Sequence, residues 1–119
     1  MQKTPFLRSK KHLDFIKTGK CLICYNSPCD PAHLGFGIGG CGLKSDDCFV
    51  VPLCREHHTI QHNIGERPFW KKHHINPFVY AVQYCAMSPC EKIKENYKDC
   101  FQEKYKKNSL LLTKNNILI

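Results

Sequence analysis

The stretch PLCREHHTIQH, residues 52–62, places one cysteine and three histidines within eleven residues. Cys54 and His57 are separated by two residues, and His58 and His62 by three, so each pair can share one face of a short helix. Thiolates and imidazoles are the ligands that zinc and other transition metals prefer. The segment therefore predicts a metal-binding helix.

A second pair of metal-binding side chains lies upstream, at Cys21 and Cys24. Such a C-x2-C pair at a turn supplies two ligands of a tetrahedral zinc site, and Cys54 with His57 completes the set. The 29 residues between the two halves exceed the spacer of a compact zinc finger, so we expect an insertion there. His58 in place of His57 is the alternative fourth ligand. Bound zinc can contribute on the order of 10–16 kcal/mol of apparent folding free energy.

The 119-residue chain has an odd number of cysteines, nine, and a lysine-rich start without the apolar stretch of a signal peptide. These features favour reduced thiols and metal ligands over disulfides. The sequence has no run of about 18 apolar residues, which predicts no membrane segment and a cytoplasmic location. A chain of this length is expected to form one domain with one modest core.

The net charge of +8 is concentrated at the two ends of the chain. Residues 1–20 hold six basic and one acidic residue, residues 21–76 five of each, and residues 77–119 seven basic and four acidic. Basic flanks of this kind predict a polyanionic partner, most simply DNA, although a solvated basic face is the alternative for the C-terminal part. The expected phosphate contacts are Arg8, Lys10, Lys11 and Lys44.

Caps and prolines predict further helices around the metal-binding segment. They begin at Thr4 or Ser9, at Gly65, at Asn76 and at the capping box of Ser88, the last helix running to about Lys106. Residues 49–53 favour a strand that Pro52 ends, and the tail is ambiguous between a strand, a packed segment and a frayed end. The chain thus reads as an α+β domain, with a basic helical arm at 1–20, a metal-binding core at 21–76 and a helical extension with the tail at 77–119.

His33 lies in DPAHLG, a short extended piece ahead of the glycine-rich loop GFGIGG. A neutral imidazole with an unperturbed pKa of about 6.5 can act as a general base near neutral pH. Opposite a cation held by His58 and His62, it would form a minimal phosphodiesterase site. The alternative is a structural His33 with two surface histidines on a helix. The loop has no surrounding βαβ pattern, so we interpret it as flexible backbone that can approach a phosphate rather than as a dinucleotide site.

The order C-x2-C, AH, a glycine-rich loop, VPLCREHH and a histidine four residues on resembles the HNH endonucleases, the ββα-metal or His-Me finger superfamily. PAHLGFGIGGCGLKSDD followed by VPLC is similar to a phage-borne subfamily, the recombination-enhancement (Ref-like) nucleases. The resemblance is strong over residues 21–62 and weaker from 7 to 77. It implies a zinc-braced ββα-metal core between an N-terminal helix and a C-terminal helical extension, with His33 as general base, His58 and His62 as ligands of the catalytic ion, and Cys21, Cys24, Cys54 and His57 as the ligands of structural zinc.

The implied function is metal-dependent hydrolysis of DNA phosphodiester bonds with little sequence specificity, in phage recombination in the bacterial host cytoplasm and with a recombination protein as a further partner. Mg²⁺, Mn²⁺ and Zn²⁺ are all open as the catalytic ion. Many superfamily members have a metal ligand where Ala32 stands and an asparagine where Phe49 stands. Asp30, Asp47 and water are therefore candidates for the third ligand. Alternative functions are a zinc-dependent DNA-binding module without catalysis and a scaffold for a recombination protein.

The remaining aromatic, histidine and cysteine residues have structural interpretations. Phe69 and Trp70 are expected to pack in the core rather than to stack on bases. Helix surfaces are the expected place of His12, His73 and His74. We expect ordinary thiols at Cys29, Cys41, Cys48, Cys85, Cys90 and Cys100, of which the first three lie close enough in sequence to compete as zinc ligands.

Overall fold

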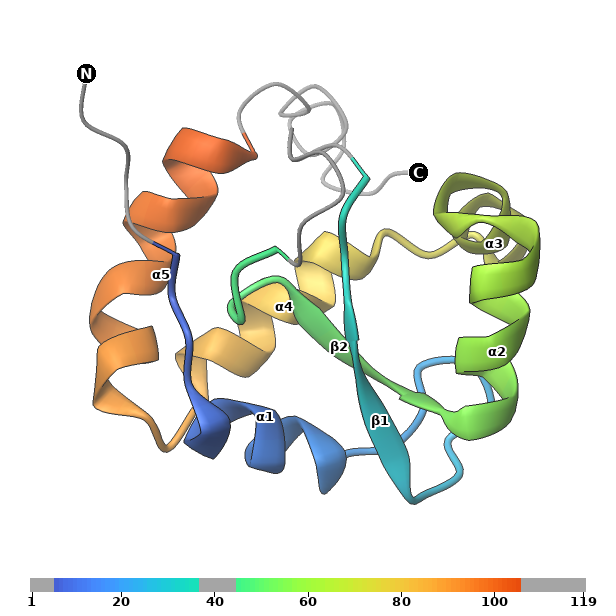
Figure 1. Cartoon of the computed structure of the whole chain (residues 1–119), viewed down its shortest axis with the longest axis horizontal. Helices are drawn as coiled ribbons and strands as arrows, with labels where there is room; N and C mark the ends of the chain where they lie inside the picture. Colours follow the sequence, from blue (N-terminus) through green and yellow to red (C-terminus); the bar gives the residue numbers. More distant parts are fainter. Residues whose placement is uncertain (1–5, 37–44, 106–119) are drawn as a thin grey trace.

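The computed structural model, drawn in Figure 1, describes residues 6–36 and 45–105. An antiparallel pair of strands, β1 (Cys29–His33) and β2 (Val50–Cys54), crosses the middle of the molecule. Helix α2 (Arg55–Ile64) follows β2 without a connecting loop. The two strands and this helix form one continuous unit, because the last residue of β2 is also the N-cap of α2.

Within the described residues, four more helices surround this unit. Helix α1 (Lys10–Lys17) contacts both strands, α3 (Glu66–His73) packs against α2, and α4 (Pro77–Ala86) packs against β2 and α5 (Glu91–Lys104). In Figure 1, α2 and α3 lie on one side of the strand pair and α4 and α5 on the other. The α+β class is confirmed. None of the helices in the described residues has the length and apolar character needed to cross a membrane.

Strand β2 is buried along its whole length. The expectation that Pro52 ends this strand is wrong, since the strand continues to Cys54. Pro52 stands directly opposite Pro31, and an antiparallel pair has positions at which facing residues exchange no hydrogen bonds, so neither missing N–H breaks the ladder. The carbonyl of Pro52 accepts a hydrogen bond from the Leu22 amide at 3.2 Å, on the other edge of the strand.

The core gathers side chains from the strand pair and from α3, α4 and α5. Phe49 is fully buried, with its ring 4.6 Å from that of Phe101 and 6.2 Å from that of Phe78, measured between ring centroids. Phe69 and Trp70 are 0% and 2% exposed, which confirms the prediction that they pack in the core. Aromatic burial of this kind is the largest apolar contribution available to a domain of this size.

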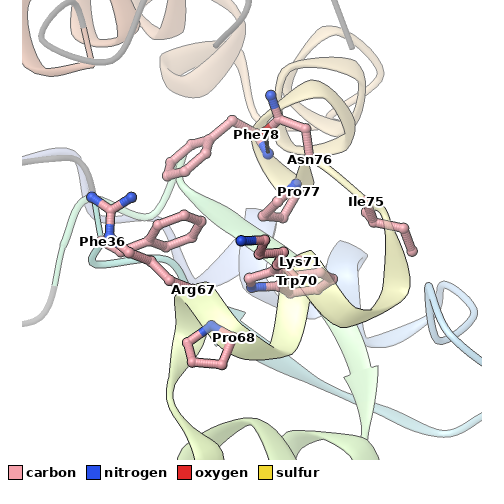
Figure 2. Close-up of a pocket in the computed structure, with 9 residues that line it drawn as sticks. All are labelled: Phe36, Arg67, Pro68, Trp70, Lys71, Ile75, Asn76, Pro77 and Phe78. Atoms are coloured by element: carbon pink, nitrogen blue, oxygen red, sulfur yellow. Dashed lines mark hydrogen bonds between the residues drawn. The ribbon is translucent and has the colours of Figure 1, made fainter. Parts of the chain in front are cut away.

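A pocket of about 600 Å³ lies beside this core, between α3 and the beginning of α4 (Figure 2). Trp70, Asn76, Pro77 and Phe78 are its buried lining residues, and Phe36 from the segment after β1 forms a partly exposed wall. The pocket is therefore shaped by residues far apart in the sequence.

Three of the predicted helix beginnings are observed, at Ser9, Gly65 and Asn76, and the one at Ser88 is not. Ser9 accepts a hydrogen bond from the His12 amide at 3.0 Å, and Asn76 accepts one from the Phe78 amide at 3.0 Å. The predicted capping box at Ser88 is wrong, because α5 begins only at Glu91. The Ser88 hydroxyl instead accepts from the Cys90 amide at 3.1 Å and pairs with the His12 ring at 2.8 Å.

His12 is fully buried, so the prediction of a surface position for it is wrong. It lies one turn before Ile16 on the face of α1 that packs inward, and its Nδ1 contacts the Ser88 hydroxyl. Burial lowers the pKa of His12 to about 4, against the opposing charge of Asp47, because a buried imidazolium loses its hydration. Of the other two histidines, His74 is exposed as predicted and His73 is half-buried.

The buried His12 predicts a pH dependence of stability. In the unfolded chain its pKa is near 6.5 and in the folded chain about 4, so the unfolded state binds more protons between these values. Stability is therefore lost as the pH falls from 6.5 to 4, by about 3 kcal/mol for this group. His12→Gln is expected to lose correspondingly less stability over this range, measured by denaturant unfolding at a series of pH values. All other titratable groups are the same in both proteins, so equal acid losses would contradict the assignment to His12.

Candidate metal centre and histidine–aspartate pairs

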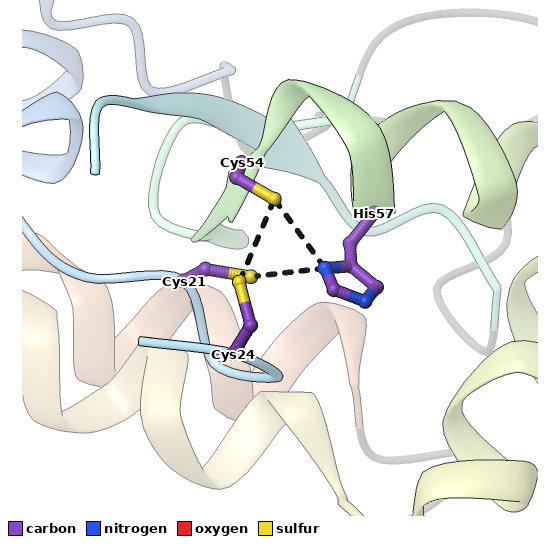
Figure 3. Close-up of side chains that lie close together, drawn as sticks. All are labelled: Cys21, Cys24, Cys54 and His57. Carbon is purple, nitrogen blue, oxygen red and sulfur yellow. Dashed lines mark hydrogen bonds between the residues drawn. The ribbon is translucent and has the colours of Figure 1, made fainter. Parts of the chain in front are cut away.

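Four side chains converge at the junction of β2 and α2 (Figure 3). The ligand atoms of Cys21, Cys24, Cys54 and His57 all lie within 4.8 Å of one another. Within residues 6–36 and 45–105, they are the one group of at least three cysteine, histidine or acidic side chains close enough together to hold a cation. This is the predicted zinc set, with His57 rather than His58 as the fourth member.

Local backbone structure brings the two halves of this centre together. Residues 22–24 form a turn in which the Tyr25 amide donates to the Cys21 carbonyl at 2.9 Å, and the Leu22 amide donates to Pro52 in β2. Cys54 ends β2, and His57 lies in the first turn of α2. The turn thus lies against the strand end, and the helix start directs His57 toward the turn.

The spacing of the ligand atoms fits a tetrahedral zinc site. Zinc bonds of about 2.3 Å to sulfur and 2.0–2.1 Å to nitrogen place two sulfurs about 3.8 Å apart and sulfur and nitrogen about 3.6 Å apart. The Cys24 and Cys54 sulfurs are 3.8 Å apart, and the His57 Nδ1 lies 3.7 Å from the Cys21 sulfur and 3.3 Å from the Cys54 sulfur. Burial acts against ionisation of Cys21, but backbone amides that hydrogen-bond its sulfur lower its pKa and favour the thiolate that zinc requires.

The competing cysteines lie outside this centre. Cys29 faces Cys54 across the strand pair, but its thiol donates to the Asn26 carbonyl at 3.4 Å, and burial raises its pKa to about 11. Cys48 is fully buried in the core and its carbonyl accepts from the Cys85 thiol at 3.3 Å. Cys41 lies outside the described residues. Sequence spacing left Cys29 and Cys48 as possible zinc ligands. The positions of their side chains in the structure place them outside the four-residue centre.

The two histidines beyond the zinc ligands form a pair on α2. Their Nε2 atoms are 3.2 Å apart, and the Nδ1 of His58 lies 3.1 Å from a carboxylate oxygen of Asp30 in β1. Asp30 also pairs with the Arg55 guanidinium at 2.8 Å, and this hydrogen bond lowers the pKa of Asp30. Asp30 thus contacts the nitrogen of His58 that faces away from His62.

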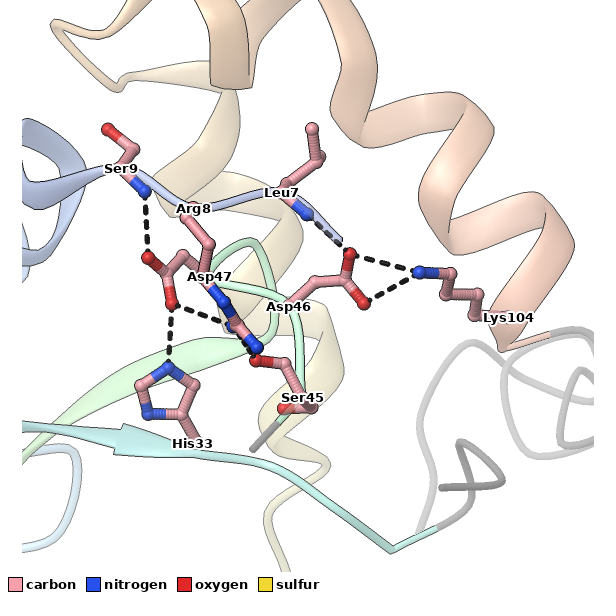
Figure 4. Close-up of polar contacts among 8 residues, drawn as sticks. All are labelled: Leu7, Arg8, Ser9, His33, Ser45, Asp46, Asp47 and Lys104. Carbon is pink, nitrogen blue, oxygen red and sulfur yellow. Dashed lines mark hydrogen bonds and ion pairs between the residues drawn. The ribbon is translucent and has the colours of Figure 1, made fainter. Parts of the chain in front are cut away.

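His33, at the other end of β1, has a carboxylate partner of its own (Figure 4). Its Nε2 lies 2.8 Å from a carboxylate oxygen of Asp47, and the side chains are 18% and 4% exposed. Burial opposes ionisation of Asp47, but hydrogen bonds from His33 and from the Ser9 amide lower its pKa below the ordinary value. An ionised Asp47 accepts hydrogen bonds only, so in the neutral form of the His33 ring Nε2 carries the hydrogen and Nδ1 carries the lone pair.

Asp46 and Asp47 also fasten the N-terminal segment to the molecule (Figure 4). The Leu7 amide donates to Asp46 and the Ser9 amide to Asp47, each at 2.8 Å. Lys104 from α5 lies 3.0 Å from the fully buried Asp46. Three distant parts of the chain therefore meet at these two carboxylates.

Two of the predicted phosphate contacts, Arg8 and Lys10, are paired with groups of the chain itself. Arg8 precedes α1, and its guanidinium contacts the Ser45 carbonyl and Asp47, the latter at 3.4 Å. Lys10 pairs with Asp14 at 3.0 Å, and Lys11 is exposed on α1. Lys44 lies outside the described residues, as does the tail from residue 106.

Sequence reasoning missed the pairing roles of three acidic side chains. Asp30 and Asp47 were expected only as candidate cation ligands, and Glu66 was not expected at the site. The carboxylate of Glu66 accepts hydrogen bonds from the amides of Gly35 at 2.9 Å and Phe36 at 3.3 Å. The sequence held one signal for the contact between Asp47 and His33. Asp46 and Asp47 lie just before β2, and β2 pairs with β1, the strand that ends at His33.

Comparison with known proteins found a family model that matches this chain. Residues 2–88 match the family described as protein of unknown function (DUF968), and this match covers most of the chain. The chain belongs to the DUF968 family. The DUF968 match includes the four zinc-centre residues and His33, His58 and His62.

One curated relative is the uncharacterized protein YdfU of Escherichia coli (strain K12). It is 46% identical over 54 residues, which cover 44% of this chain and 16% of the relative. The matched part of the chain thus spans about a sixth of the length of that protein. No solved structure matches the chain.

The geometry of the metal centre predicts that substituting two buried cysteines, Cys54 and Cys29, has different effects on zinc content and stability. Cys54→Ser is expected to lose the bound zinc and most of its thermal stability, because the four-ligand set then lacks one thiolate and the free energy of metal binding is coupled to folding. Cys29→Ser is expected to retain one zinc per chain, since serine can keep the hydrogen bond to Asn26. Elemental analysis and thermal unfolding measure both effects. Equal zinc content and melting temperature in the two variants would remove zinc from this site.

Proposed function

We propose that the chain is a metal-dependent DNA endonuclease of the HNH type. The observation that carries this proposal is the pair of imidazole nitrogens on α2, His58 and His62, whose Nε2 atoms lie 3.2 Å apart beside the zinc centre. Two nitrogen ligands of one ion with bonds of about 2.1 Å lie roughly 3.0–3.4 Å apart. The pair therefore suits a divalent cation with its remaining coordination positions open to water and phosphate.

Asp30 supports this pair as an orienting carboxylate. It accepts from the Nδ1 of His58, which leaves the Nε2 of that ring unprotonated and directed at His62. A carboxylate behind a metal-binding histidine fixes the tautomer and the ring orientation. In this proposal water, rather than Asp30 or Asp47, fills the third coordination position.

His33 is the proposed general base, and Asp47 holds its ring. With the Nε2–H donated to Asp47, the Nδ1 lone pair is available to take a proton from the attacking water. Asp47 also stabilises the imidazolium that this step creates, as a carboxylate partner does for a histidine base. A divalent cation at His58 and His62 would neutralise the charge that develops on the phosphate and on the leaving oxygen.

The charge distribution favours DNA as the substrate. The chain carries a net charge of +8, and residues 1–20 hold six basic residues against one acidic residue. Contacts to the phosphate backbone give salt-sensitive binding with little dependence on sequence. Recruitment by a recombination protein, as in the phage-borne nucleases that the sequence resembles, is part of this proposal.

A DNA-binding module without catalysis is the second candidate, and Ala32 favours it. Many HNH nucleases have a metal ligand at this position, whereas Ala32 is 1% exposed within the core. A chain that binds DNA through its basic flanks and uses zinc only for folding needs no ion at His58 and His62.

Nicking of supercoiled plasmid tests the proposal. Zinc-loaded wild type with added Mg²⁺ or Mn²⁺ is expected to nick the plasmid, and His33→Ala to do so at least about 100-fold more slowly, because a general base contributes roughly 10²–10⁴ to the rate. His62→Ala is expected to be folded, with unchanged zinc content, and inactive. Conversion to open-circular DNA is measured on agarose gels over time.

His74→Asn serves as the matched control. His74 is exposed with a φ of 56°, a conformation that asparagine also adopts, so this variant is expected to keep the wild-type rate. A wild-type protein that binds DNA but nicks it in none of Mg²⁺, Mn²⁺ and Zn²⁺ would leave the non-catalytic module as the function.

A further inference from the structure

The pocket between α3 and α4 has aromatic and cationic lining residues that the proposed cleavage chemistry does not use (Figure 2). Its volume of about 600 Å³ lies in the range of small-molecule sites, roughly 300–1,000 Å³. Figure 2 shows the Phe36 and Phe78 rings, Pro77 and the Lys71 side chain around the same space, with Trp70 below them. The position of the pocket, its charge and the unpaired Nε1 of Trp70 together indicate a ligand.

The Phe36 wall is held in place by Glu66. The Glu66 carboxylate, at the start of α3, accepts hydrogen bonds from the backbone amides of Gly35 and Phe36. A side chain at Gly35 would meet this carboxylate, because an added Cβ would lie 3.3 Å from one of its oxygens. The segment after β1 is thereby fastened to the helix that forms the opposite wall, so the pocket is formed before a ligand binds.

The charged lining residues of the pocket are cationic. Arg67 and Lys71 project from the same helix, and both side chains are exposed. The Arg67 guanidinium lies 5.3 Å from the centroid of the Phe36 ring. A ligand that combines a flat apolar part with a negative charge fits this arrangement, because the rings pack against its apolar part and the cations attract its charge.

One buried polar group among the lining residues needs a partner. The Nε1 of Trp70 has no hydrogen-bond partner in the part of the chain that the structure describes, whereas the Asn76 side chain interacts with the buried Tyr105 hydroxyl. Trp70 is 2% exposed. Its Nε1 is a donor, and leaving a buried donor unpaired is costly, so a ligand with an acceptor atom in its ring would relieve this cost.

We propose that this pocket binds one unstacked nucleotide of a single DNA strand. The base packs among Phe36, Ile75 and Pro77, an acceptor atom on the base edge meets the Nε1 of Trp70, and the phosphate lies at Arg67 and Lys71. The inference rests on the proposed nuclease function, since it names the form of DNA that reaches the same site. Phe36 follows His33 by three residues, so their Cα atoms are at most about 10 Å apart and a strand held in the pocket passes close to His33.

Binding and cross-linking of single-stranded DNA test this pocket. The binding protein is His33→Ala, so that cleavage does not interfere, and the probe is a fluorescent ten-nucleotide DNA with one 5-iododeoxyuridine. Phe36→Leu and Arg67→Gln in this background are each expected to lower the affinity about tenfold at constant salt, measured by fluorescence anisotropy. Ultraviolet cross-linking is expected to attach the iodinated base to Phe36 or Trp70, located by mass spectrometry.

Matched controls come from the same two helices, outside the pocket lining. Tyr80→Leu removes another exposed aromatic ring, on α4, and Lys72→Gln removes another exposed cation, on α3. Neither is expected to change the affinity or the cross-linked residue. Unchanged zinc content and melting temperature verify that all variants are folded.

The possible outcomes separate this inference from the nuclease proposal. A tenfold loss on Phe36→Leu together with a cross-link in the pocket supports the site even if the wild type never nicks plasmid. Unchanged affinity on Phe36→Leu, or cross-links only outside the pocket, overturns the site even if the wild type is an active nuclease. Equal or tighter binding of an RNA of the same sequence would overturn the assignment to DNA.

Discussion

The fold depends on the junction at which β2 becomes α2. Cys54 ends the strand and caps the helix, His57 follows within one helical turn, and the turn at Cys21 and Cys24 brings two more sulfurs to the same point. A domain of this size has a net stability of only about 5–15 kcal/mol, so a structural zinc can contribute as much free energy as the whole domain retains. The same junction orients α2, and with it the histidine pair one and two turns further along.

Carboxylates inside the molecule do most of the remaining positioning. Asp30 contacts His58, Asp47 contacts His33, and Glu66 holds the backbone at Phe36. Each is balanced by a histidine, an arginine or backbone amides, which is how buried or half-buried charge is tolerated. Four of the five acidic residues in 21–76 serve internal contacts in this way, namely Asp30, Asp46, Asp47 and Glu66. Lys104, from the basic C-terminal part of the chain, is drawn into the same network by Asp46.

Residues whose partners are close in sequence were predicted well. The zinc set was predicted from two short spacings, and the beginnings of α1 and α4 from Ser9 and Asn76, because a cap bonds an amide only two or three residues away. Residues whose partners are distant were predicted poorly. Ser88 has a sequence suited to a capping box, yet its hydroxyl pairs with His12, 76 residues away. No local pattern indicates that contact.

The sequence alone determined which side chains can bind metal and where most helices begin, since both follow from residue type and spacing over a few positions. Only the tertiary structure decided which carboxylate accompanies which histidine, that Asp47 and not a neighbour pairs with His33, and that Phe36 meets the face of α3 across a pocket. The physical reason is that hydrogen bonds between side chains form only at about 3 Å, and such distances between residues far apart in the chain are set by how the elements pack.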